Sequence, residues 1–475
     1  MPLPGIQFVF PLIRPQRYVT HYYAKQALNY TIQNECDFNW THTQNILLYQ
    51  PTVNYIKNIV NSQPIADDFY EKYSKFVDKF GARPSGSSTL ERAIDHMVDL
   101  TFQSGLNDVW TESVKVPHWQ RGYESLTMIL PRTRNMTILG LGPSVPTPTA
   151  GIVAEVVVVN SFTELETIAH TVPGKIVLFN AHFTSYQETV KYRQYCAIAA
   201  AKHGAIAVLV RSITPFSLYT PHTGSLYYEE GIRKIPAAAV TLEDADFLQR
   251  VYNRRKKVVV KLKMFNDLSL KESRNVIIDV KGQENPDNIV IVSGHIDSWD
   301  VGKGAIDDGG GMMISWFVPV ILNHLSLWPK RTIRSILWTA EEPGYIGAAS
   351  YLQRHSNELD KIDFIMESDA GTFEPLGLEV VGSPDVRCLI AKVLKLFAPM
   401  DAIKNVNITG SDIELFLNLG IPGASLLNQN DQYFWFHHTQ ADTLTVQNKT
   451  NVVKCAAFWA AVTYVIADLP FDIPP

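Results

Sequence analysis

The sequence predicts an α/β fold: a mostly parallel mixed sheet with helices on both faces, into which a β-rich module is inserted. After residue 275, short apolar runs alternate with helical segments, and this alternation is typical of a parallel sheet. Between residues 122 and 270 the pattern changes to short strands separated by proline and glycine. We therefore expect an N-terminal arm or leader over 1–50, a main domain over 51–121 and 271–475, and an insert over 122–270.

The first part of the main domain is predicted to be mostly helical. A helical pattern runs from Tyr55 to Phe80. After a turn, Ser88 and Glu91 form a capping-box signature, which predicts a helix that extends through Leu100. A strand is expected over Val109–Val116, just before the insert begins.

The insert is predicted to be β-rich, or α+β. Strands are expected over Gly151–Asn160, Gly174–Asn180 and Ala205–Val210. Only one strong helical pattern interrupts them, over Tyr192–His203.

Strand–loop–helix units fill the rest of the main domain. Ile289–Ser293 is a continuous apolar run, which is typical of a strand buried on both faces. Further strands are expected over Thr332–Trp338, Ile362–Met366 and Gly423–Leu427. Helices are expected over Met312–Leu325, Gly347–His355, Asp385–Phe397, Ser411–Leu419 and Val452–Ala467.

The composition is that of a globular protein and excludes several partner classes. Hydrophobic residues make up 46% of the chain and charged residues 19%, with a net charge of −5. Such a chain has no basic field for nucleic acid and no cationic membrane patch. The most apolar stretch, Ala456–Ala467, is too short for a transmembrane segment, which needs roughly 20 residues, so we expect a core helix there.

Cysteines and glycosylation sequons bear on the compartment. The cysteines are widely spaced, form no CxxC pair, and fit buried thiols about as well as disulfides: Cys36, Cys196, Cys388 and Cys455. Five Asn-x-Ser/Thr sequons favour the secretory pathway and glycosylation: Asn29, Asn39, Asn135, Asn407 and Asn448. The apolar run Gly5–Ile13 is interrupted by Pro11 and has no basic residue before it, so no clear signal peptide is identified.

An acid or a histidine follows most predicted strands of the second half. In chain order the candidates are His295, Asp307 with Asp308, Glu341 with Glu342, Asp369, and His437 with His438. Each has an ordinary alternative: a surface histidine, a helix N-cap or a solvated loop acid. Ligands of parallel sheets bind beyond the carboxyl ends of the strands, so these groups are expected to meet there. Carboxylates at that density repel one another unless a divalent metal lies between them.

This pattern resembles the co-catalytic di-zinc aminopeptidase/glutamate carboxypeptidase family, whose five metal ligands follow the order His, Asp, Glu, Asp, His. The motifs that carry the resemblance are Gly294-His295, Asp307-Asp308-Gly309-Gly310, Glu341-Glu342, Glu367-Ser368-Asp369 and His438-x-x-x-Asp442-Thr443. The resemblance implies a zinc exopeptidase fold and two zinc ions per chain.

The resemblance also assigns the ligands. His295, Asp307 and Asp369 would hold one ion. Asp307, Glu342 and His438 would hold the other, so that Asp307 bridges the two.

Two further roles follow from the same resemblance. Glu341 would be the general base that takes a proton from the attacking water and passes it to the leaving amine. Asp297 would orient the imidazole of His295 from outside the ligand set. The family also leads us to expect a cis peptide bond between Asp307 and Asp308.

A closer resemblance, to the glutamate carboxypeptidases within this family, extends from about Phe80 to the end of the chain. It rests on Pro117–Gly122, Ile138–Gly142, Pro221–Gly224, Ser298–Gly302, Trp338–Glu342 and Glu367–Phe373. It implies that the insert is a protease-associated-type domain, that the protein is a secreted or lysosomal homodimer, and that small peptides are the substrates. Dipeptides with both termini free are the expected substrate class.

Two alternative functions are considered. The same ligands would serve an aminopeptidase that trims longer peptides, because both activities share the metal chemistry. A non-catalytic, receptor-like binding module can use the same fold. In such a module the ligand positions would be lost, whereas all five positions and Glu341 are occupied by suitable residues here.

Overall fold

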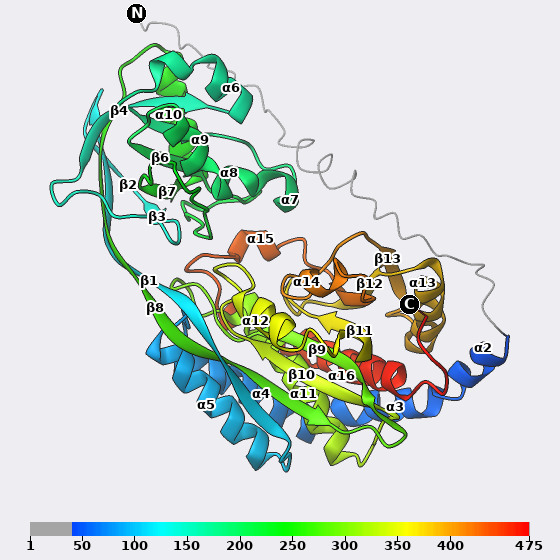
Figure 1. The fold of residues 1–475 in the computed structure, drawn as a ribbon. Helices are drawn as coiled ribbons and strands as arrows, with labels where there is room; N and C mark the ends of the chain where they lie inside the picture. The colour runs from blue at the N-terminus through cyan, green and yellow to red at the C-terminus, as the bar shows by residue number, and fades with distance from the viewer. Residues whose placement is uncertain (1–39, 475) are drawn as a thin grey trace, which may run out of the picture.

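The computed structural model describes residues 40–474, which form two lobes joined by two long strands (Figure 1). These strands, β1 (Val109–Leu130) and β8 (Val259–Val280), pair with each other in antiparallel register over most of their length. The expected strand over Val109–Val116 is only the first part of β1. The expected limits of the insert, residues 122 and 270, lie inside these two strands, so the polypeptide enters and leaves the smaller lobe without a flexible linker.

A mixed sheet forms the centre of the larger lobe. At its middle, β9 (Asn285–His295) lies between β10 (Arg331–Trp338) and β11 (Ile362–Glu367), and all three strands are parallel. The order across the sheet is β13-β12-β14-β11-β9-β10-β8. The outer strands on the β11 side are β12 (Pro375–Val381), β13 (Ala402–Asn405) and β14 (Gly423–Asn428). The expected mostly parallel, mixed sheet is confirmed.

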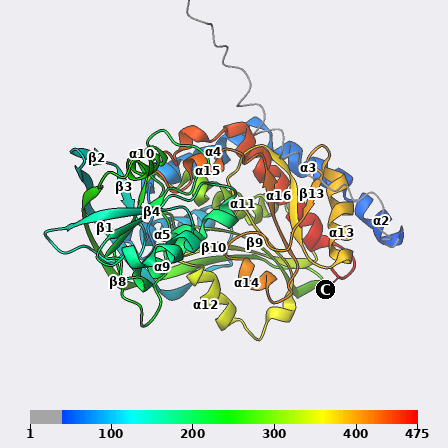
Figure 2. The ribbon, with the colours of Figure 1, turned by 90° about the horizontal axis from the view of Figure 1, so that it is seen from above.

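Helices cover both faces of this sheet, as expected. Figure 2 shows α3, α4, α11 and α16 on one side of the strands and α12 and α14 on the other. The first group, with α5 and α13, shares one hydrophobic core. The helices of the larger lobe are α2 (Trp40–Leu47), α3 (Gln50–Val60), α4 (Gln63–Phe80), α5 (Ser88–Gln103), α11 (Gly310–His324), α12 (Ile346–Arg354), α13 (Pro384–Leu394), α14 (Glu414–Leu417), α15 (Tyr433–Phe436) and α16 (Lys449–Asp468).

Two helical segments, Ala305–His324 and Lys449–Asp468, are long and apolar enough to span a membrane by length and composition. Both lie inside the molecule, with 94% and 83% of their apolar windows buried. The expected core helix over Ala456–Ala467 is therefore confirmed, because every residue of that stretch is buried within α16.

The smaller lobe contains more helix than the sequence predicted. Its strands β4 (Ile152–Val159), β5 (Ile176–Phe179), β6 (Ala207–Arg211) and β7 (Ala237–Val240) run parallel in that order. Two short strands complete it, β2 (Arg134–Met136) and β3 (Ile138–Gly140). The helices are α6 (Phe162–Thr167), α7 (Tyr186–Thr189), α8 (Lys191–Gln194), α9 (Cys196–Lys202) and α10 (Leu242–Asn253).

The prediction of a single strong helix in this lobe was wrong in two respects. The expected helix Tyr192–His203 is divided at Tyr195, whose backbone leaves the helical region (φ −111°, ψ 2°). The sequence reading also missed α10, which Thr241 caps by accepting a hydrogen bond from the Asp244 N–H at 3.1 Å. Helices thus pack on both sides of the parallel strands, and two separate hydrophobic clusters result.

Three helix boundaries of the larger lobe also differ from the prediction. The expected helix Tyr55–Phe80 is two helices, because the chain turns at Ser62 and α4 restarts with a proline in its first turn. Ser87, not Ser88, caps α5, and its hydroxyl accepts from the Leu90 N–H at 3.1 Å. The expected helix Ser411–Leu419 is reduced to the four residues of α14.

The described part of the chain includes some of the cysteines and sequon residues. Cys196 and Cys455 are free and buried, as expected for small apolar side chains. The sequon residues Asn135, Asn407 and Asn448 are exposed. Asn29, Asn39 and Cys36 lie outside the described residues.

Candidate metal centre

The carboxyl ends of three adjacent parallel strands carry most of the predicted ligands. His295 ends β9, Glu341 and Glu342 follow β10, and Asp369 follows β11. Asp307 lies in the kinked segment Ala305–Gly309 that leads into α11, where its own backbone is not helical (φ −130°, ψ 89°). His438 is brought to the same place by the short helix α15. Strand ends meet at one edge of a parallel sheet, which is why residues so distant in sequence converge.

One set of side chains gathers around His295. Its Nε2 lies 3.2 Å from Oδ1 of Asp307 and 3.2 Å from Oδ1 of Asp369. The His295 side chain is fully buried, and those of Asp307 and Asp369 are 5% and 14% exposed.

A second set gathers around His438. Its Nε2 lies 3.1 Å from Oδ2 of Asp307 and 3.2 Å from Oε2 of Glu342. The carboxylate of Asp307 therefore presents one oxygen to each histidine, and it is the one side chain common to the two sets. The cis peptide bond expected between Asp307 and Asp308 is present.

The donor chemistry of these sets fits a divalent metal. Oδ2 of Asp307 and Oε1 of Glu342 are buried without a hydrogen-bond donor in the described part of the chain. Buried carboxylate oxygens without partners are costly, and a cation removes that cost. Imidazole nitrogens together with carboxylate oxygens are the usual ligands of catalytic zinc.

Asp308 takes no part in this bridging arrangement. Its Oδ1 accepts from the Gly311 N–H at 3.1 Å, and its Oδ2 accepts from the His295 N–H at 3.1 Å. Asp308 thus satisfies backbone donors at the start of α11, as an N-cap does, and ties that start to β9.

Asp297 contacts His295 and also the loop that follows β10. The Nδ1 of His295 lies 3.1 Å from the backbone carbonyl oxygen of Asp297, whereas the Asp297 carboxylate is 3.7 Å away. That carboxylate instead accepts from the backbone N–H groups of Glu341 and Glu342, at 3.0 and 3.4 Å. Asp297 therefore orients His295 through its main chain and holds the two glutamates through its side chain.

Asp442 supports the turn that carries Asp307. Its Oδ1 accepts from the N–H groups of Ala305 and Ile306, both at 2.8 Å. Burial, followed by the nearby charge of Asp307, raises the pKa of Asp442 to about 7.

Electrostatic interactions in this centre shift several pKa values in the metal-free protein. Burial opposes charging of His438, but Glu342 and Asp307 together outweigh it and raise the pKa of His438 to about 9. Burial, then Asp307, raises the pKa of Glu342 to about 7. Burial also raises the pKa of Glu341 well above its usual range. Protons thus compensate part of the charge that a metal would compensate.

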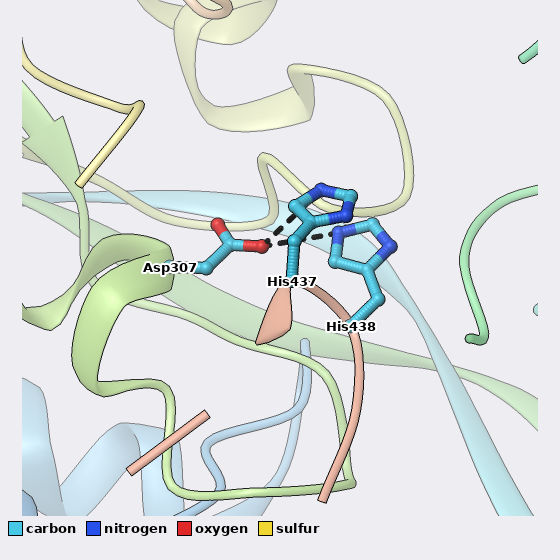
Figure 3. Close-up of side chains that lie close together, drawn as sticks. All are labelled: Asp307, His437 and His438. Atoms are coloured by element: carbon cyan, nitrogen blue, oxygen red, sulfur yellow. Dashed lines mark ion pairs between the residues drawn. The ribbon is translucent and has the colours of Figure 1, made fainter. Parts of the chain in front are cut away.

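The sequence analysis did not assign His437 to the centre. Its Nε2 lies 3.5 Å from Oδ2 of Asp307, and its ring stacks on that of His438 with centroids 3.5 Å apart (Figure 3). Two consecutive residues point to the same side because His438 has a positive φ of 61°. The adjacent histidines were the only signal in the sequence, and they did not reveal this backbone conformation.

The chain is similar to known peptidases over most of its length. The family model described as Peptidase family M28 matches residues 275–463. Carboxypeptidase Q of Xenopus laevis is 44% identical over 451 residues, which cover 94% of this chain and 96% of that protein. Carboxypeptidase Q of Homo sapiens is 45% identical over 410 residues, covering 85% and 86%.

Solved structures show the same fold. A Peptidase M28 precursor from Shewanella amazonensis has a TM-score of 0.86 at 31% identity, covering 90% of this chain and 99% of that one. A zinc aminopeptidase from Bacillus subtilis has a TM-score of 0.66 at 21% identity, covering 86% and 98%. The chain therefore belongs to peptidase family M28, and it is a zinc metallo-exopeptidase.

Proposed function

We propose that this enzyme hydrolyses dipeptides with both termini free, using two zinc ions bridged by Asp307. One observation carries the proposal: the two oxygens of the Asp307 carboxylate face two different histidines. Oδ1 lies 3.2 Å from Nε2 of His295, and Oδ2 lies 3.1 Å from Nε2 of His438. In this proposal His295 and Asp369 complete one site, and Glu342 and His438 complete the other.

The protein groups then have distinct tasks. When bound, the zinc ions polarise the scissile carbonyl and lower the pKa of a bound water to roughly 7. Glu341 takes the proton of that water and passes it to the leaving amine. Its Oε2 lies 3.9 Å from Nε2 of His295, farther than the proposed ligands, and its backbone N–H is held by Asp297.

A small substrate is supported by the relatives and by the shape of the site. Relatives that are 44% and 45% identical to this chain carry the name carboxypeptidase Q. The smaller lobe also lies against the metal centre: the hydroxyl of Ser225 donates to the Glu342 carbonyl oxygen at 2.5 Å. A pocket at this contact is lined by residues of both lobes, among them Trp119, Ser225, Trp299 and Glu342. In this proposal, the smaller lobe at this contact limits the length of peptide that reaches the ligands.

An aminopeptidase acting on longer peptides is the second candidate. It is favoured by a relative of 26% identity named probable leucine aminopeptidase 2, from Aspergillus fumigatus. Kinetics on dipeptides with free, N-blocked and C-blocked termini, beside a hexapeptide series, distinguish the two. Dipeptidase activity requires both free termini. N-terminal trimming of hexapeptides at equal or higher kcat/KM would favour the aminopeptidase instead.

The roles of the adjacent glutamates give the direct test of the mechanism. Glu341→Gln removes the proton acceptor and keeps the shape, so we expect kcat to fall by about 10²–10⁴-fold with zinc content unchanged. Glu342→Gln removes a ligand, so zinc content and activity should fall together, and added zinc should restore part of the activity. Near-normal turnover of Glu341→Gln would contradict its role as the base.

The compartment and assembly are part of the same proposal. We propose a glycosylated homodimer in the secretory pathway, supported by the exposure of Asn135, Asn407 and Asn448. N-glycosidase treatment of protein from its native source should reduce the mass, and light scattering should give twice the chain mass. A cytosolic, unglycosylated monomer would contradict this part without affecting the peptidase mechanism.

A further inference from the structure

Pro221–Ser225, which we call the docking loop, is a segment of the smaller lobe that reaches the metal centre. Two hydrogen bonds join it to His438. The Thr223 N–H donates to the carbonyl oxygen of His438 at 3.1 Å, and Nδ1 of His438 lies 3.1 Å from the carbonyl oxygen of Thr223. The backbone and the ring of this histidine are therefore both held by the same residue of the other lobe.

The second of these bonds determines which nitrogen of His438 is available to a metal. A carbonyl oxygen can only accept, so this bond uses a hydrogen on Nδ1. Nε2, which lies 3.1 and 3.2 Å from the carboxylates of Asp307 and Glu342, is then the nitrogen that offers a lone pair once a metal displaces its proton. An imidazole held in this way is oriented for metal binding before the metal arrives.

The docking loop also contacts the neighbours of His438. Nδ1 of His222 donates to the His437 carbonyl oxygen at 2.7 Å, and Ser225 contacts the main chain of Glu342. The set around His295 differs, because His295 is oriented by Asp297 of its own lobe. Among residues 40–474, the smaller lobe is thus bonded to the set around His438, whereas the hydrogen bond that orients His295 comes from the larger lobe.

Arg193 of α8 holds the docking loop in this conformation. Its side chain is buried, its Nε donates to the Ser225 carbonyl oxygen at 3.2 Å, and its Nη1 lies 3.5 Å from both the Thr223 carbonyl oxygen and Nδ1 of His438. Gly224 lies against it: a Cβ there would be 2.3 Å from Cζ of Arg193, and its φ is +140°. The loop therefore has little space for another conformation.

We propose that the docking loop is a positioning element for the metal site formed by Asp307, Glu342 and His438. Docking of the smaller lobe and metal binding at that one site are then thermodynamically linked: each strengthens the other. Thr223 and Arg193 act as positioning residues through His438. This inference rests on the two-zinc site of the proposed function.

Two glycines of the smaller lobe provide a matched pair of variants. Gly224→Ala forces a Cβ against Arg193, whereas at Gly231, which also has a positive φ of +80°, a Cβ would meet nothing within 4 Å. Both substitutions carry the backbone cost of a positive φ, but only the first displaces the docking loop. Zinc per chain is measured after dialysis against a graded series of free zinc concentrations.

We expect Gly231→Ala to behave as the wild type and Gly224→Ala to bind one of its two zinc ions about 10–100-fold more weakly, the usual effect of losing an orienting contact. Arg193→Lys removes the guanidinium fork but keeps the charge, and it should weaken binding of the same single zinc ion. This variant replaces Gly224→Ala in the test if Gly224→Ala does not fold. Two zinc ions of native affinity in folded Gly224→Ala or Arg193→Lys would overturn the proposal, and so would equal weakening of both sites. A wild-type protein that binds fewer than two would instead overturn the two-zinc function.

Hydrogen exchange tests the reciprocal effect. The Thr223 N–H is bonded to His438, so zinc addition to the metal-free wild type should slow exchange of the peptide that contains residues 221–225. Exchange of this peptide that is unaffected by zinc would overturn the linkage.

Discussion

At the scale of single residues, the metal centre depends on close packing at the start of α11. Asp307 and Asp308 are followed by three glycines, Gly309–Gly311. A Cβ at Gly311 would lie 1.9 Å from the carbonyl oxygen of Ser368, next to Asp369. Only glycine allows the turn bearing Asp307 to lie so close to the end of β11. The glycines therefore set the spacing between two proposed ligands.

The bridging role of Asp307 predicts an asymmetric response to ligand substitution. Asp307→Asn removes the negative charge shared by both sets, so we expect zinc binding to weaken at both sites. Asp369→Asn should weaken one site only, because its carboxylate faces His295 alone. Zinc per chain, measured at graded free zinc, checks this difference. Identical stoichiometry curves for the two variants would contradict the bridge.

At the scale of elements, a buried arginine ties the N-terminal helices to the metal-site loops. Arg83, in the turn between α4 and α5, donates to the carbonyl oxygens of Ile296, Lys303 and Gly304 at 2.8, 2.9 and 3.0 Å. These carbonyls belong to the segments that follow His295 and precede Asp307. Helices far from the chemistry in sequence therefore stabilise the loops that carry it.

The cap of α5 provides a stability prediction with an adjacent control. Ser87→Ala removes the hydroxyl that accepts from Leu90, so we expect the free energy of unfolding to fall by about 1 kcal/mol. Ser88→Ala should change it by less than about 0.5 kcal/mol, because Ser88 is the first helical residue and alanine favours helix. Urea unfolding of the two variants measures the difference. A larger loss for Ser88→Ala would mean that the other serine is the cap.

At the scale of the whole molecule, the two lobes meet where the charge is most concentrated. Five acids, Asp297, Asp307, Glu341, Glu342 and Asp369, lie around His295 and His438 with little exposure to solvent. Without metal, burial raises the pKa of Glu341 and Glu342, because no cation stabilises their charged forms. Metal binding is therefore expected to contribute to the stability of the folded chain as well as to catalysis.

Removal of metal should accordingly lower the melting temperature. A chelator such as EDTA should lower the Tm of the wild type, and stoichiometric zinc should restore it, because zinc binds the folded chain in preference to the unfolded one. Glu341→Gln retains the proposed ligands and should show the same zinc-dependent shift. Glu342→Gln should show a smaller one. An identical Tm with and without chelator in the wild type would contradict a structural contribution of the metal.

Local pattern was enough to predict much of this protein. The buried strands β9, β10 and β11 were recognisable as apolar runs, and the polar groups that follow them could be placed together because parallel strand ends share one edge. The α/β class follows from such signals, and the same signals singled out the candidate ligands. Helix α10 and the break at Tyr195 were missed, because capping and backbone geometry within one short segment give weak patterns.

The sequence by itself determined which groups are available for metal chemistry, because the residue type sets the donor atoms and their order along the strands sets where they emerge. Only the tertiary structure decided how those groups face one another. The two oxygens of Asp307 face different histidines. His437 and His438 point to the same side because the φ of His438 is positive. Thr223 orients His438 across 215 positions of sequence. Such contacts arise from the packing of one lobe on the other, and no local pattern in the chain encodes them.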